Sequence, residues 1–296
     1  MRRSKPWLTA DQRTNRLEWC ILRLNWGLPG WALVLWSDET SCILGESRGC
    51  GRVTRLLEEE WDDNCTEKTW KEVSTFIFWG CIAYGYKGPC HIYTKETPAM
   101  RIASIKELKI LNNIRELEEH SEWDINQANI DADYETNGTQ RRGMRPLWEN
   151  QFRPYTRSEG GGIDWYRYNR DILRPIFLPA YTEFRQTRPG ALLMQDGCSN
   201  HTSRWNRAIF EEFIVIILDW PGNSPDLNPI EHIWRILKDR VAARRPYIRG
   251  RTGLEIAFLD EWDKLSIEHD INPLIVLHVK LIGQVIAAQG NNDFHG

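Results

Sequence analysis

The chain lacks several features that would assign it to common classes of protein. No apolar run approaches the roughly 18 residues that a membrane span needs, and the start, Met1–Pro6, lacks the apolar stretch of a secretory signal. The seven cysteines include no CxxC pair, which argues against both a disulfide framework and a zinc knuckle. We therefore expect an intracellular protein with reduced, mostly buried thiols and no membrane partner.

Excess charge of one sign is also missing, but the charge is unevenly distributed. A net charge of −3 over 296 residues argues against a protein that coats nucleic acid. Residues 232–251, however, hold seven basic residues against Asp239 alone. Such a run beside a carboxylate suits a polyanionic substrate, and a solvated helix face is the alternative interpretation.

Apolar runs and turn signals predict a mixed α/β core. The first half should hold a helix and up to four strands, at 7–26, 31–36, near 43–56, 73–84 and 90–94. Residues 100–162 begin as a charged amphipathic helix, turn polar and end in three glycines, which indicates an insertion. The second half should hold, in order, a bent helix, a strand, a helix, a strand and three helices, at 164–185, 191–195, 204–212, 213–218, 230–243 and within 252–289.

Three acidic residues stand where a strand ends or a helix begins. Asp38 and Asp196 follow apolar strands, where open sheets present their sites, and Glu231 opens a helix. Carboxylate oxygens are ligands that Mg²⁺ prefers, so a fold that joined the three would suit phosphoryl transfer on nucleic acid. Asn228 and Pro229 mark the N-cap and first position of that helix, so Glu231 could instead be the acid half of a capping box.

Residues 220–234, WPGNSPDLNPIEHIW, resemble the catalytic signature of mariner-superfamily DDE transposases, and of the fungal branch in particular. The resemblance extends to further segments and covers nearly the whole chain: Gln195-Asp196, His201–Ser203, Trp36–Thr40, Trp79–Ile82, Gly161–Tyr168 and, weakly, Gly290–Phe294. It implies a ribonuclease-H-like mixed sheet flanked by helices, with a largely helical insertion and C-terminal helices. It also implies DNA strand cleavage and strand transfer at transposon ends and target, in the nucleus, by a possible homodimer.

Carried onto this sequence, the family's catalytic and metal-binding acids are Asp38, Asp196 and Glu231, which would hold two Mg²⁺ or Mn²⁺ ions. Arg235 and Lys238 share a helix face with Glu231 and are candidate phosphate contacts on double-stranded DNA. His201 resembles a family histidine that could contact DNA or tune a carboxylate, and a structural hydrogen bond is the alternative.

The resemblance divides the chain into a linker segment at 1–30, a catalytic domain at 31–245 interrupted by the insertion 100–162, and a helical extension at 246–296. By position the insertion could be a clamp or a DNA-binding arm, or a plain solvated excursion.

Two departures from the family pattern affect the expected function. Family members usually have Asn after the second Asp, where this chain has Gly197. They also carry two helix-turn-helix modules ahead of the first catalytic strand, whereas only some thirty residues precede Trp31 here. We therefore expect no independent recognition of transposon ends. A catalytically inactive or domesticated relic that acts as a DNA-associated or interaction protein is the alternative function.

Overall fold

The computed structural model describes residues 7–43, 75–139, 143–144, 146–160, 162–244 and 248–292. The chain divides into two compact units, one formed by Met1–Thr94 with Arg167–Gly296 and the other by Lys95–Tyr166. The weak strand expected near 43–56 lies, beyond Ile43, outside the described residues, as do Cys50 and Cys65. The five cysteines within them are all free thiols.

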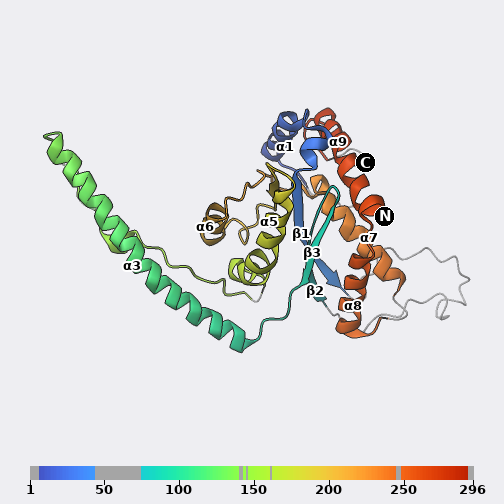
Figure 1. Cartoon of the computed structure of the whole chain (residues 1–296), viewed down its shortest axis with the longest axis horizontal. Helices are drawn as coiled ribbons and strands as arrows, with labels where there is room; N and C mark the ends of the chain where they lie inside the picture. The colour runs from blue at the N-terminus through green and yellow to red at the C-terminus, as the bar shows by residue number, and fades with distance from the viewer. Residues whose placement is uncertain are drawn as a thin grey trace, which may run out of the picture. The chain divides into compact units, whose positions relative to one another are not determined.

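A four-stranded sheet of order β3-β2-β1-β4 forms the centre of the first unit (Figure 1). β1 (Val34–Ile43), β2 (Thr75–Ala83) and β3 (Tyr86–Ile92) pair antiparallel. β4 (Leu192–Met194) pairs parallel with β1. The mixed sheet expected from the sequence is confirmed.

Helices cover both faces of this sheet. α5 (Leu178–Gln186) and α6 (Arg204–Glu212) lie on one side, and α7 (Pro229–Ala243) and α8 (Gly250–Asp263) lie on the other (Figure 1). α1 (Ala10–Arg23), α2 (Gly27–Trp31) and α9 (Asn272–Ala287) pack together at one end. The core is rich in tryptophan, with Trp31, Trp36 and Trp234 almost fully buried.

The apolar C-terminal helix packs against this core on one side. Ile267–Ala287 is the one stretch in the described residues that is long and apolar enough to cross a membrane by length and composition. This differs from the expectation that no run approaches a span. Ile275, Ile282 and Val285 are buried, whereas Val276 and Leu277 are 42% and 54% exposed, so packing explains part of its apolar character.

The helical run before β4 is bent by a π-helix. α4 (Trp165–Tyr168) passes into η3 (Asn169–Phe177), which contains Pro175 and leads into α5. Tyr168 donates its hydroxyl to Gln195 Oε1 at 3.0 Å, and Tyr181 donates its hydroxyl to the carbonyl of Ala191 at 2.8 Å. The two tyrosines therefore hold the chain on either side of β4.

Two strand predictions need correction. The first strand begins at Val34, because Trp31 belongs to α2, and it continues past Asp38 to Ile43, with the eight residues Trp36–Ile43 paired to β2. The strand expected at 213–218 is reduced to one parallel bridge between Leu193 and Ile217. A turn causes this: Ile214 has a φ of 50°, and Val215 N–H donates back to Phe210 in α6.

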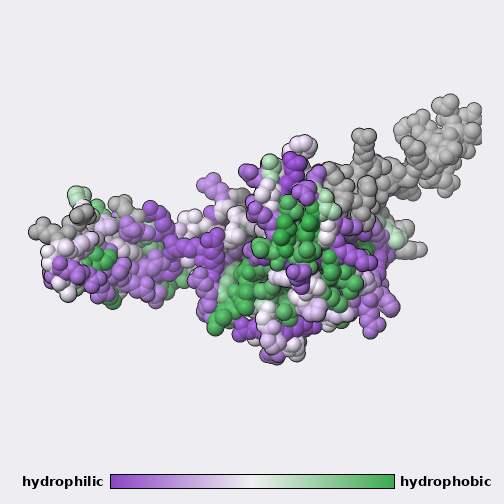
Figure 2. Space-filling model, turned by 90° about the horizontal axis from the view of Figure 1, so that it is seen from above, coloured by the Kyte–Doolittle hydropathy of each residue, from purple (hydrophilic) through white to green (hydrophobic). Residues whose placement is uncertain are grey.

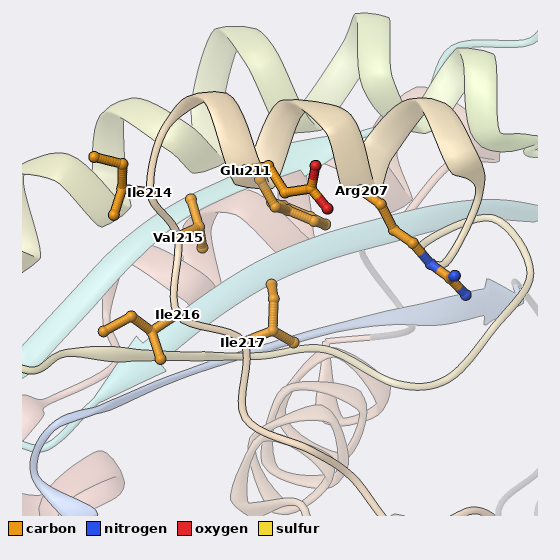
Figure 3. Close-up of a pocket in the computed structure, with 7 residues that line it drawn as sticks. Arg207, Glu211, Ile214, Val215, Ile216 and Ile217 are labelled. Atoms are coloured by element: carbon orange, nitrogen blue, oxygen red, sulfur yellow. The ribbon is translucent and has the colours of Figure 1, made fainter. Parts of the chain in front are cut away.

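That segment is open to solvent instead of buried. Ile214 is 76% exposed and Ile216 50%. With Arg207 and Glu211 of α6, Ile214–Ile217 line an open pocket of about 410 Å³. Figure 3 shows these side chains. The sheet edge on this side is therefore irregular.

The second unit consists of one long helix and the chain that returns along it. α3 (Pro98–Thr136) has 39 residues and is capped by Thr97, whose side chain accepts a hydrogen bond from Met100 N–H. It continues well beyond the amphipathic start on which the prediction rested, through a stretch that is mostly polar (Figure 2). The return segment contains the short helix η2 (Trp148–Asn150) and Arg157, which pairs with Glu96 and Asp164.

A buried arginine fixes α1 to the loop before α7. Arg16 is fully buried, its two terminal nitrogens lie 2.8 and 2.7 Å from the carboxylate oxygens of Asp226, and its Nε donates to Gly290 O. Asp226 therefore forms an ion pair with a buried arginine. A second pair joins Arg23 to Asp219, which is 73% exposed.

We expect Asp226→Ala to destabilise the fold by about 3 kcal/mol, because it leaves a buried guanidinium without its counter-ion. The matched change Asp219→Ala also leaves a buried arginine, Arg23, but it removes an acid that is 73% exposed and screened by water, so it should cost at most about 1 kcal/mol. Urea unfolding of both variants gives the comparison. Equal losses would show that the lower exposure of the Arg16–Asp226 pair carries no special cost.

Candidate active site

β1 carries two adjacent acidic residues to opposite faces of the sheet, because side chains alternate along a strand. Asp38 faces α7, where Trp234 Nε1 donates to its Oδ2 at 3.2 Å. Glu39 faces the other side, where its Oε1 lies 3.4 Å from the Tyr93 hydroxyl and 3.4 Å from His201 Nε2. One strand therefore supplies a carboxylate to each of two side-chain clusters.

The start of α7 brings Glu231 to Asp38. Asn228 caps the helix by accepting a hydrogen bond from Ile230 N–H at 3.4 Å, and Pro229 takes the first helical position. Glu231 consequently lies in the first turn, where it interacts electrostatically with Asp38. Its position at the helix start is therefore compatible with a place in the site.

The pKa values of Asp38 and Glu231 are both raised. Burial, followed by the negative charges of Glu231 and Glu39, raises the pKa of Asp38 well above its ordinary value. Burial also raises the pKa of Glu231, although the Lys238 ammonium and a hydrogen bond with Asp38 act in the opposite direction. The pair therefore binds a proton more readily than two isolated carboxylates would.

Asp196 is held by a histidine on the Glu39 side. It follows β4 and Gln195, its Oδ1 accepts from Cys198 N–H at 3.1 Å, and the same oxygen lies 2.6 Å from His201 Nδ1. Burial acts to lower the pKa of His201, but the carboxylates of Glu39 and Asp196 outweigh it and raise that pKa well above its ordinary value. Burial acts to raise the pKa of Asp196, but the hydrogen bond and charge of His201 outweigh burial and lower that pKa.

A cavity of about 410 Å³ joins these elements. Its lining comes from β1, the end of β4, the loop before α7 and the first turn of α7. The three acids predicted from the sequence all line it, with these further residues: Met194, Gly197, Cys198, Trp220, Gly222, Asn223, Ser224, Pro225 and Asn228. The fold thus brings Asp38, Asp196 and Glu231, from three separate elements, to one cavity.

The donor chemistry of the cavity fits a hard divalent cation, because three carboxylates face it and two of them repel each other. The three acids are not gathered tightly, however. Among the described residues, no group of three or more His, Cys, Asp or Glu side chains is close enough to hold one ion. Asp196 instead contacts His201, whose other ring nitrogen lies 3.4 Å from Glu39 Oε1.

The other predicted site residues lie near this cavity to different degrees. Lys238 is close enough for its charge to oppose the rise in the pKa of Glu231. Arg235 lies exposed one turn after Glu231. His201 is buried and contacts Asp196, which fits two of the roles left open for it, the tuning of a carboxylate and a structural hydrogen bond.

Sequence reasoning missed Glu39 and the two tyrosines around it. Tyr93 contacts Glu39, and the Tyr168 ring packs against His201 with centroids 4.4 Å apart. Glu39 lies beside Asp38 within Trp36–Thr40, a segment that resembles the family, and this could have marked it as a candidate site residue. Asp38, expected at a strand end, lies instead within β1, opposite Gly80 of β2. A Cβ added at Gly80 would approach the Trp262 ring to 2.5 Å.

Residues 166–252 match a family model described as DDE superfamily endonuclease. The Tc1 transposase of Caenorhabditis elegans is 26% identical over 242 residues, which cover 81% of this chain and 63% of that protein. The Tc3 transposase of the same nematode is 33% identical over 97 residues, covering 33% of this chain and 29% of the relative. The chain thus spans less than two thirds of the length of these relatives.

Solved structures of Mos1 transposase share the fold. Its catalytic domain, solved with Raltegravir and Mg, superposes with a TM-score of 0.54 at 12% identity, covering 98% of this chain and 100% of that one. A pre-cleavage Mos1 transpososome gives a TM-score of 0.60 at 12% identity, covering 100% of this chain and 68% of that one. At such identity the likeness concerns the fold.

The sheet order, the flanking helices and the matched segment define a ribonuclease-H-like endonuclease domain of the DDE superfamily. Sequence relatives narrow this class further. Among transposases, the chain is similar to those of the Tc1/mariner type.

We expect Glu231→Gln to raise the melting temperature at neutral pH by about 2–4 °C, the shift that roughly 1 kcal/mol produces in a chain of this size. The change removes a charge that opposes ionisation of Asp38. Because the pKa values of both acids are raised in the folded protein, the stability that protonation contributes is present at low pH and is lost as pH rises.

The difference between the variant and the wild type should therefore vanish below the ordinary carboxyl pKa of roughly 4. Exposed Glu212, changed to Gln, provides the matched control and should leave the melting temperature unchanged. A Glu231→Gln protein that is no more stable than this control at neutral pH would contradict the coupling between Asp38 and Glu231.

Proposed function

We propose that this chain performs metal-dependent DNA strand cleavage and strand transfer, with Asp38, Asp196 and Glu231 as ligands of two Mg²⁺ or Mn²⁺ ions. The observation that carries the proposal is the cavity lined by all three acids within a DDE-type fold. Ions bound there would activate a water or a DNA 3′-hydroxyl for attack and stabilise the leaving oxygen. Two Mos1 structures were solved with Mg and Mn, respectively, which supports the choice of metal.

Each ligand has a partner in the chain that sets its position. Trp234 Nε1 donates to Asp38 and so orients that carboxylate toward α7. The mutual repulsion of Asp38 and Glu231 favours a cation between them over two bare charges. His201 contacts Asp196, which lines the same cavity as Asp38 and Glu231.

We propose double-stranded DNA as the substrate and the nucleus as the compartment. Mos1 transposase has been solved as a paired-end complex with a left transposon end, which supports a DNA partner for this fold. Arg235 and Lys238, beside Glu231, would contact phosphates, since a strand entering an acidic cavity needs nearby positive charge. Imaging of a fluorescent fusion checks the compartment, and exclusion from the nucleus would oppose it.

Calorimetry with Mn²⁺ tests the metal site directly. We expect saturable binding by the wild type and at least about tenfold weaker binding by Asp38→Ala and Asp196→Ala, because each removes one ligand. Binding should also weaken as pH falls, because Asp38 takes up a proton readily. Glu212→Ala is the matched control. Equal binding by all four proteins would show that the three acids do not form one site.

A non-catalytic DNA-associated protein is the second candidate function. Two observations favour it: Asp196 pairs with His201 instead of joining Asp38 and Glu231, and Gly197 replaces the family's usual Asn. Nicking of supercoiled DNA in Mn²⁺ separates the candidates. Nicking that is lost in Asp38→Ala supports the enzyme, and metal binding without nicking by the wild type supports the non-catalytic function.

The salt dependence of DNA binding tests the two basic residues. A phosphate contact contributes about 0.9 to the slope of log K against log salt, so Arg235→Ala and Lys238→Ala should each lower that slope by about this amount. Arg174→Ala, which changes an exposed arginine in η3, is the control and should leave the slope unchanged. Unchanged slopes in both test variants would remove these residues from the DNA interface.

A further inference from the structure

Glu39 is an acid that the proposed catalytic chemistry leaves unused. It is the neighbour of Asp38 on β1 but lies on the opposite face of the sheet, and its side chain is 20% exposed. Its Oε1 accepts a hydrogen bond from the Tyr93 hydroxyl at 3.4 Å and lies 3.4 Å from His201 Nε2. A carboxylate with so little access to water needs charged or hydrogen-bonding partners, and His201 is the partner that leads back to the cavity.

His201 connects Glu39 to the second acid of the cavity. Its Nδ1 lies 2.6 Å from Asp196 Oδ1, while its Nε2 faces Glu39. Only 7% of its side chain is exposed, and the Tyr168 ring packs against it with centroids 4.4 Å apart. The two nitrogens belong to one rigid ring, so a contact at one of them fixes the direction in which the other points.

The loop that carries His201 is held in place without Glu39. Asn206 of α6 is fully buried and donates from its Nδ2 to Asn200 O at 2.7 Å. The Oδ1 of the same residue accepts a hydrogen bond from Asn169 Nδ2 at 2.9 Å. The backbone beside His201 is therefore tied to two helical segments, and what Glu39 can set is the orientation of the imidazole ring.

The two oxygens of Asp196 have different surroundings. Oδ1 is engaged by the His201 ring and by Cys198 N–H at 3.1 Å, whereas no described residue donates a hydrogen bond to Oδ2. The side chain is 49% exposed and lines the cavity together with Asp38 and Glu231. One oxygen is thus anchored to the chain, and the other is left for a ligand.

We propose that Glu39 is a positioning residue for Asp196 and acts on it through His201. Glu39 orients the ring, the ring holds Oδ1, and the carboxylate is thereby kept in one orientation. The inference rests on the proposed function, because Asp196 must be a metal ligand for its orientation to affect metal binding. Partners that orient a ligand in this way are worth about ten- to a hundredfold in metal affinity.

Calorimetry of the full chain with Mn²⁺ tests the effect on the metal site. We expect Glu39→Ala to bind Mn²⁺ at least about tenfold more weakly than the wild type. Glu39→Gln keeps an acceptor oxygen at the same position and should recover most of that loss. The matched control is Glu261→Ala, which removes an acid of α8 that is 8% exposed and pairs with Arg244 and Lys264. It should bind like the wild type.

Two results of this titration have different meanings. Glu39→Ala that binds Mn²⁺ as tightly as the wild type would overturn the positioning role and leave the proposed function intact. A wild type that binds no Mn²⁺ would contradict the proposed function, and the behaviour of the His201 ring then decides whether Glu39 holds it.

A double variant tests the route through His201. If Glu39 acts through the ring, Glu39→Ala should weaken Mn²⁺ binding no further in a protein that already carries His201→Ala. Additive losses would show that Glu39 affects the cavity by another route, such as the backbone of β1, and would reject His201 as the link.

The hold of Glu39 on the ring can be followed without metal, by NMR of the protein labelled with ¹⁵N at histidine. We expect the ring N–H that faces Asp196 to exchange slowly with water in the wild type and in Glu261→Ala, and measurably faster in Glu39→Ala. The spectrum of His201→Ala assigns the signal. Unchanged exchange in Glu39→Ala would overturn the proposal, because the ring would then be held without Glu39.

Discussion

The alternation of side chains along β1 is the constraint on which the site depends. Asp38 and Glu39 are adjacent, so a buried central strand must place one carboxylate on each face of the sheet. Buried acids are costly unless they find hydrogen bonds or charges. Trp234 supplies a donor on one face, and His201 and Tyr93 supply donors on the other. The two clusters share the backbone of β1, so a shift of that strand would alter both.

Much of the fold followed from short-range patterns. α6 occupies the predicted residues, and α7 begins one residue earlier, because Ser203 and Asn228 are strong caps placed just before apolar periodicity. The segment 213–218 was mispredicted because continuous apolar character is also compatible with an exposed sheet edge. The turn at Ile214 and the single bridge at Ile217 make this segment an exposed edge, and no feature of the sequence indicates either of them.

The three acids of the cavity could be predicted from motifs, but their contacts could not. Nothing in the spacing indicates that His201 reaches both Asp196 and Glu39, because that depends on the fold of the loop after β4. The structure also shows how much space surrounds Gly197, where the chain departs from the family pattern. A Cβ there would meet nothing within 4 Å, so packing does not require glycine and leaves room for the family's larger residue.

The π-helix before β4 determines how the site tolerates changes in chain length. Tyr168 and Tyr181 are thirteen positions apart, and at about 100° per residue a regular helix would point them about 220° apart. The wider turn of η3 brings both hydroxyls to the chain around β4. Loss or gain of one residue in 169–177 would rotate one tyrosine away and release the strand that carries Asp196. Insertions and deletions in this helix would therefore displace Asp196 from the cavity. Substitutions on the exposed side of the helix would do so far less.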